Sequence, residues 1–193
     1  MHIHLCIGFL ERRDGPFLGL REFMNTQVLP RFGGTTVGYS SWRDDVAREV
    51  AAHAGAKPLI LVGHSYGASA LFRAVWRLRE VEVGHFIMLD PVPRWLWGQF
   101  QWSAYRLPEN VRAATCFYNP VSLPKSSPIR NVRGNAGYRN VVVRPWHAAI
   151  PGDAEVQRGM MEIIAEAHAG WGAGHATLAG EQVKVPPVVV KGL

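Results

Sequence analysis

The chain carries a G-x-S-x-G motif, from Gly63 to Gly67, between an apolar run and a segment with helical periodicity. Residues 58–62 predict a buried strand, and the apolar spacing of residues 68–79 predicts a helix. A sharp strand-to-helix turn lifts its serine clear of the sheet, and glycine tolerates the crowding beside it. The motif therefore predicts a nucleophile at Ser65, the alternative being an ordinary Gly-Ser loop.

Short apolar runs and helix-length amphipathic segments alternate along the chain. Predicted strands cover residues 3–9, 35–40, 58–62, 83–89, 112–118 and 141–143. Predicted helices cover residues 17–29 and 68–79, and two more begin after Ser41 and Asp153. Parallel neighbours need crossover connections, and strands that are apolar throughout need cover on both faces. The pattern predicts an α/β fold, with a mostly parallel sheet and helices on both faces.

Length and composition predict one domain. The chain has 193 residues, 48% of them hydrophobic, which is ample material for one core. We assign residues 1–169 to this domain and residues 170–193, rich in glycine, alanine and proline, to a loosely attached tail. No apolar run reaches the length of a transmembrane helix, and the first residues lack the features of a signal peptide.

The two cysteines, Cys6 and Cys116, lie in different predicted strands. This placement suits buried thiols in a reducing compartment better than a disulfide. Because nothing in the sequence directs export, we expect a cytoplasmic protein without disulfide bonds.

A serine nucleophile needs a carboxylate to orient its base, and parallel strands present functional residues at their carboxyl ends. The carboxylates between the motif and the downstream histidines are Glu80, Glu82, Asp90 and Glu109. Only Asp90 stands directly at the carboxyl end of a predicted strand, and no Asp or Glu occurs between Asn110 and Gly152. We therefore predict Asp90 as the acid; the alternative is an aspartate that only caps a turn.

Three histidines follow Asp90, namely His147, His168 and His175. His147 comes just after the last predicted strand, whereas His168 lies within the final helix and His175 in the tail. Only His147 has a fixed place at the edge of the sheet, so it is the predicted base. The alternative is a half-buried histidine without a chemical role.

Three segments resemble those of α/β-hydrolase lipases and esterases. They are Ile7-Gly8-Phe9, the motif at residues 63–67 with the alanine after it, and Met88-Leu89-Asp90-Pro91-Val92-Pro93. They are similar to the oxyanion, nucleophile and acid segments of the pancreatic and lipoprotein lipase type, except that Ile7 replaces the usual histidine. In size the chain is more similar to minimal, capless cutinase-like esterases. The resemblance spans roughly residues 3–165.

This resemblance implies an ester hydrolase with a catalytic triad and no cap domain. Ser65 would attack an acyl carbonyl, His147 would take the proton and later return one, and Asp90 would orient the imidazole. The backbone N–H groups of Phe9 and Tyr66 would form the oxyanion hole. These steps need no cofactor and no metal. The family usually places its acid one strand later, where this chain has Asn119.

Aromatic residues and basic residues both lie close to the predicted triad. Trp95 and Trp97 follow Asp90 and Trp146 precedes His147, so these rings would offer an acyl chain an apolar wall, or simply pack. The net charge of +6 matches one acid-free segment that contains Arg112, Lys125, Arg130, Arg133, Arg139 and Arg144. That segment would favour an anionic substrate or an acidic surface, or is a solvated loop.

The sequence thus predicts a hydrolase of small-molecule or lipid-like esters. A thioesterase or amidase with the same triad stays open, because only the acyl and leaving-group pockets would differ. An inactive binding protein with the same motif is a further alternative. A nucleic-acid-binding module would explain the arginines, yet no binding-fold signature accompanies them. The pair His2 and His4 suits a metal-dependent hydrolase, but no downstream set of ligands is evident.

Overall fold

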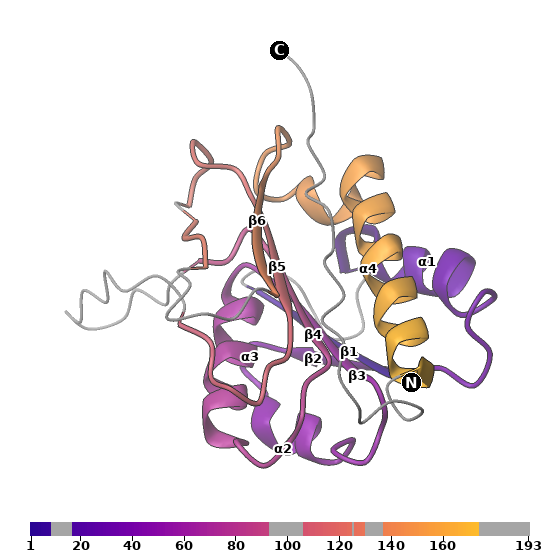
Figure 1. The fold of residues 1–193 in the computed structure, drawn as a ribbon. Coiled ribbons are helices and arrows are strands. Elements are labelled where there is room, and N and C mark those ends of the chain that lie inside the picture. The colour runs from indigo at the N-terminus through magenta and orange to yellow at the C-terminus, as the bar shows by residue number, and fades with distance from the viewer. Residues whose placement is uncertain (9–16, 93–105, 125, 130–136, 174–193) are drawn as a thin grey trace.

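The computed structural model describes residues 1–8, 17–92, 106–124, 126–129 and 137–173 (Figure 1). Within these residues, six parallel strands form one sheet in the order β2-β1-β3-β4-β5-β6. The strands are β1 (His2–Ile7), β2 (Thr36–Ser41), β3 (Leu59–His64), β4 (His85–Leu89), β5 (Ala114–Tyr118) and β6 (Tyr138–Val142). The predicted parallel sheet is therefore confirmed.

Helices cover both faces of this sheet, as the sequence predicts (Figure 1). On one face α2 (Val46–Ala51) and α3 (Tyr66–Arg77) enclose a core cluster, and on the other α1 (Leu20–Phe23) and α4 (Ala154–Ala173) enclose a second. Successive residues of a strand point to opposite faces. Each apolar strand can therefore supply both cores at once.

The strand order reverses between β1 and β3. The chain goes from β1 to β2 on one side, and then crosses to β3 on the other side and continues outward to β6. In open α/β sheets a ligand binds beyond the carboxyl ends of the strands at such a reversal. The residues placed there are Gly8, after β1, and Ser65, after β3.

Three elements differ most from the sequence prediction. Helix α2 begins at Val46, with the Asp45 side chain as its N-cap, whereas the predicted helix begins just after Ser41, which is the last residue of β2. The segment from residue 17 to 29 is a 3-10 turn (Phe17–Gly19), the short α1 and a π-helical stretch (Met24–Val28), because Leu18 and Gly19 take positive φ angles. Strand β6 begins at Tyr138 rather than at residue 141. Its first residues are polar, which hides an edge strand from a search for apolar runs, although its backbone pairs with β5 throughout.

Both cysteines are buried free thiols. Burial raises the pKa of Cys6 to about 12, and it also raises the pKa of Cys116, so neither is a reactive thiolate. Among the described helices, none is both long and apolar enough to cross a membrane. Helix α4 continues to Ala173, and the rest of the predicted tail lies outside the described residues. The division at residue 169 stays a prediction.

Candidate active site

Ser65 occupies the turn between β3 and α3 in a strained backbone conformation, with φ 56° and ψ −126°. Its N–H donates to the Leu89 carbonyl at 3.0 Å, which ties the turn to the end of β4. A Cβ atom on Gly63 would overlap the backbone of Ala68, and one on Gly67 would overlap the carbonyl of Cys6. The two glycines of the motif are therefore required by close backbone approach.

Asp90 follows β4 and is completely buried. Its Oδ1 accepts a hydrogen bond from the Asn119 N–H at 2.9 Å, and its Oδ2 accepts one from the Ser122 hydroxyl at 2.7 Å. Burial by itself would raise the pKa of Asp90, but hydrogen bonds from His147, Ser122 and Asn119 outweigh burial and lower it. The site thus favours an ionised carboxylate inside the protein.

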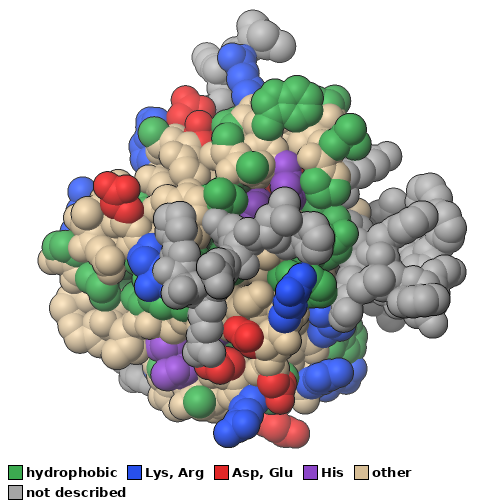
Figure 2. Space-filling view, turned by 180° about the vertical axis from the view of Figure 1, so that it is seen from behind, with side chains coloured by type: hydrophobic (Ala, Val, Ile, Leu, Met, Phe, Trp, Pro, Cys, Tyr) green, Lys and Arg blue, Asp and Glu red, His purple; other side chains and the backbone are tan. Residues whose placement is uncertain are grey.

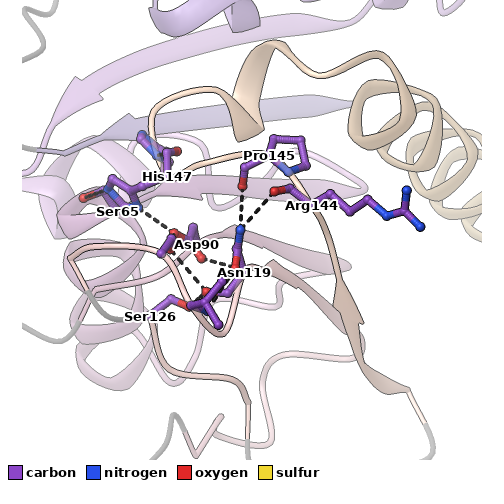
Figure 3. A network of polar contacts seen from close by, with 10 residues as sticks. Ser65, Asp90, Asn119, Ser126, Arg144, Pro145 and His147 are labelled. Atoms are coloured by element: carbon purple, nitrogen blue, oxygen red, sulfur yellow. Dashed lines mark hydrogen bonds and ion pairs between the residues drawn. The ribbon is translucent and has the colours of Figure 1, made fainter. Parts of the chain in front are cut away.

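His147 lies in the turn after β6 and connects the other two side chains (Figure 3). Its Nδ1 is 2.6 Å from Asp90 Oδ2, and its Nε2 is 2.9 Å from Ser65 Oγ. An Nδ1–H that donates to the carboxylate leaves Nε2 free to accept the serine hydroxyl proton. The three predicted catalytic residues therefore form one chain of hydrogen bonds.

The other candidate acids and bases lie elsewhere. Glu82 pairs with Arg112, and the ring of His168 packs against Phe32 with 5.2 Å between centroids. Glu80 and Glu109 are exposed residues outside the strands. His175 lies outside the described residues.

The predicted oxyanion site is described in part. An ideal Cβ on Gly8 would stand 2.6 Å from Ser65 Cβ and 2.9 Å from the Tyr66 nitrogen, so the end of β1 lies directly against the serine turn. The Tyr66 N–H belongs to the first turn of α3, where a helix carries partial positive charge. The second predicted donor, Phe9, lies outside the described residues.

Two residues of the site escaped the sequence prediction, His64 and Asn119. The His64 Nε2–H donates to the carbonyl of His147 at 3.0 Å, and the two imidazole centroids are 4.7 Å apart. The Asn119 side-chain amide donates to the carbonyls of Arg144 and Pro145 at 3.0 and 3.1 Å (Figure 3). Both contacts join a side chain to the backbone of a distant segment, for which a single sequence offers no signal.

The residues expected to contact substrate are described unevenly. Trp146 is 66% exposed beside His147, and Val121 and Leu123, in the loop after β5, are 74% and 79% exposed. Figure 2 shows hydrophobic side chains around histidine near the top of that view. Trp95 and Trp97 lie outside the described residues, so the apolar wall that we predict is represented by Trp146 alone.

The described basic side chains of segment 110–152 make different contacts, and none of these contacts is with the triad. Arg112 pairs with Glu82, and the Arg139 guanidinium donates to the Thr115 hydroxyl at 3.0 Å. The Arg144 side chain extends away from the triad, while its carbonyl faces Asn119 (Figure 3). Lys125, Arg130 and Arg133 lie outside the described residues.

The histidine pair in β1 belongs to the buried sheet and not to the site. His2 Nδ1 is 2.7 Å from the Thr36 hydroxyl, and His4 Nε2 is 2.9 Å from the Ser40 hydroxyl. Across the described part of the chain, no group of three or more His, Cys, Asp or Glu side chains is placed to hold a metal ion.

Comparison with known proteins gives matches of structure but not of sequence. No protein-family model and no curated protein matches the chain. A protein from Xanthomonas campestris pv. campestris assigned to the α/β superfamily of hydrolases is 14% identical, with 86% of this chain and 98% of that chain covered and a TM-score of 0.58. Est1E from Butyrivibrio proteoclasticus is 13% identical, with 87% and 88% covered and a TM-score of 0.57. Human thioesterase 2 is 13% identical, with 86% and 95% covered and a TM-score of 0.51.

These three superpositions cover 86 or 87% of this chain. The chain has the α/β-hydrolase fold. The helices and strands that the structure describes include no large cap domain. Its serine turn follows β3, and its buried aspartate follows the next strand, β4. Asn119 takes the place after β5.

Proposed function

We propose that this α/β-hydrolase is a serine hydrolase that cleaves carboxylic esters through an acyl-enzyme. The observation that carries the proposal is the hydrogen-bonded chain from Asp90 through His147 to Ser65, with distances of 2.6 and 2.9 Å. A strained serine whose hydroxyl touches an oriented imidazole is the arrangement that nucleophilic catalysis requires.

The reaction follows from these contacts. Ser65 Oγ attacks the ester carbonyl while His147 Nε2 takes its proton, and buried Asp90 stabilises the imidazolium that forms. The new oxyanion is held by the N–H groups of Tyr66 and Phe9, and each such donor contributes about 3 kcal/mol to transition-state stabilisation. The imidazolium then protonates the leaving alcohol. Water, activated by the same histidine, releases the acid from the serine.

A small-molecule or lipid-like ester fits the described surface best. The exposed side chains of Trp146, Val121 and Leu123 would shield an acyl chain from water. An anionic group on the substrate remains part of the proposal, since the chain's excess positive charge lies in the segment that leads to His147.

A thioesterase is the second candidate, because human thioesterase 2 shares the fold over 86% of this chain. The same serine and histidine would serve a thioester, and an amidase would also use them. A protein that keeps the triad for binding alone would make the same contacts without turnover. A cytoplasmic location is proposed from the two buried free thiols, which suit a reducing compartment.

A panel of aryl esters and thioesters of graded chain length tests the proposal. We expect ester turnover that falls by about 10⁴-fold or more in Ser65→Ala, because no other group supplies the nucleophile. A fluorophosphonate should label the wild-type protein at Ser65 and leave the variant unlabelled. Faster turnover of thioesters would favour the thioesterase. Equal turnover by wild type and variant would overturn the serine mechanism, and labelling without turnover of any substrate would favour the binding protein.

A further inference from the structure

The turn that carries His147 is held by its backbone carbonyls. The Asn119 amide donates to the carbonyls of Arg144 and Pro145, and the His64 ring donates to the carbonyl of His147 itself. Both donors are buried side chains. Among the described strands, β6, which precedes the turn, is the edge of the sheet and pairs with β5 alone.

We propose that His64 and Asn119 are positioning residues, which place the His147 imidazole by holding its main chain from two sides. The proposal rests on the function proposed above. Each donor is also tied to another member of the triad: His64 directly precedes Ser65, and the Asn119 N–H bonds to Asp90 at 2.9 Å. The main chain of His147 is thereby tied through His64 to the serine turn and through Asn119 to Asp90. Figure 3 shows the contacts of Asn119.

The chemistry of His64 suits a structural donor and not a second base. Burial and the neighbouring His147 lower the pKa of His64 to about 3, so its ring is neutral at physiological pH. A neutral ring whose Nε2–H faces a carbonyl donates one hydrogen bond and adds no charge beside the imidazolium that forms on His147. A protonated neighbour at a 4.7 Å centroid distance would oppose that imidazolium.

At position 119 an amide can donate to the two carbonyls, whereas the isosteric carboxylate of aspartate cannot. Its two N–H bonds go to two carbonyl oxygens, and its Oδ1 accepts the Val121 N–H at 2.9 Å. An ionised aspartate at this position would present lone pairs to both carbonyls and a second negative charge beside Asp90. A protonated aspartate would still donate one hydrogen bond. The substitution therefore makes positioning depend on pH.

The test compares the pH dependence of kcat for wild type and Asn119→Asp. Wild-type kcat should keep its plateau at alkaline pH. In the variant we expect kcat to fall as the new carboxyl ionises, to about one tenth or less of wild type at alkaline pH, with KM changed little. His64→Phe should lower kcat by about tenfold at all pH values, and His64→Gln, which keeps a donor near Nε2, should recover most of that loss.

The opposite end of the sheet offers matched controls. The Asn110 amide donates to the carbonyls of Leu78 and Val81 at 3.0 and 2.9 Å, and His85 hydrogen-bonds to the Thr115 hydroxyl at 3.0 Å. Asn110→Asp and His85→Phe should lower the thermal midpoint as the site variants do. They should leave the pH profile of kcat unchanged, because they disturb half-buried hydrogen bonds at the end of the sheet opposite the triad.

A second readout does not need turnover. The low-field NMR proton of the His147–Asp90 hydrogen bond should persist across pH in Ser65→Ala and in Ser65→Ala with Asn110→Asp. In Ser65→Ala with Asn119→Asp it should vanish as pH rises. If wild type cleaves nothing yet this resonance behaves as expected, the proposed function fails and the positioning role stands. If Asn119→Asp matches Asn110→Asp in both readouts, or if His64→Phe keeps wild-type kcat, the positioning role is wrong.

Discussion

Both ends of the sheet hold buried or half-buried polar side chains, but the hydrogen bonds of these side chains differ between the two ends. At the amino end His2 and His85 each pair with a single threonine hydroxyl, and Asn110 bonds only to backbone carbonyls. At the carboxyl end Asp90 and His147 join a network that contains an ionised carboxylate and reaches a serine hydroxyl. Isolated hydrogen bonds between polar side chains therefore indicate a role in stability. A network that links an ionised carboxylate to a serine hydroxyl indicates the candidate site.

The largest expected effect comes from removing the negative charge of Asp90 from the carboxyl-end network. Asp90→Asn should lower kcat for ester hydrolysis by about 10³- to 10⁴-fold, because a neutral amide neither holds the correct tautomer of His147 nor stabilises its cation. Steady-state kinetics on the best aryl ester measures this loss. The matched change at the amino end, Asn110→Asp, should leave kcat within about twofold of wild type. Similar losses in both variants would erase the distinction between the two ends.

Acid should destabilise the folded protein through its buried imidazoles. Burial lowers the pKa of His2 to about 4 and of His64 and His85 to about 3, whereas the ordinary value is 6.5. Between these values the unfolded chain binds protons that the folded chain does not, so stability is complete above about pH 6.5 and is lost as pH falls toward 3 to 4. The lowered pKa of Asp90 adds a loss only below its ordinary value of 3.8.

Urea unfolding at a series of pH values measures this loss. We expect the free energy of unfolding to be constant near neutrality and to decline steadily below pH 6.5. His85→Gln, which removes one titrating group, should flatten that decline. A free energy of unfolding that does not change between pH 7 and pH 4 would contradict neutral buried histidines at either end of the sheet.

The smallest expected effect concerns the amino end alone. Asn110→Ala removes hydrogen bonds to the carbonyls of Leu78 and Val81 and should lower the free energy of unfolding by about 1–3 kcal/mol. Chemical denaturation measures the loss, and ester kinetics at 25 °C should remain that of wild type. A fall in kcat would show that the two ends communicate, which the separate networks do not predict.

Local patterns were sufficient for most of the fold and for the serine turn. The turn around Ser65 is specified by adjacent residues, because a strand, two glycines and a helix act within one short segment. The same holds for Asp90, whose strand ends visibly in the sequence. The break at Leu18 left no comparable pattern, since the buried residues of that segment keep helical spacing while the backbone departs from it. The prediction for β6 was too short because the first residues of this strand are polar. An edge strand is held by backbone pairing and needs no apolar run.

The sequence alone specified the α/β class and the serine turn, since hydrophobic periodicity and glycine placement are local properties of the chain. It also placed Asp90 and His147 just after predicted strands. Only the tertiary structure showed that His147 reaches both Asp90 and Ser65, and that His64 and Asn119 hold the turn between them. Those contacts join segments that lie between 25 and 83 residues apart. Their geometry is set by the packing of parallel strands, which brings distant carboxyl ends to one edge.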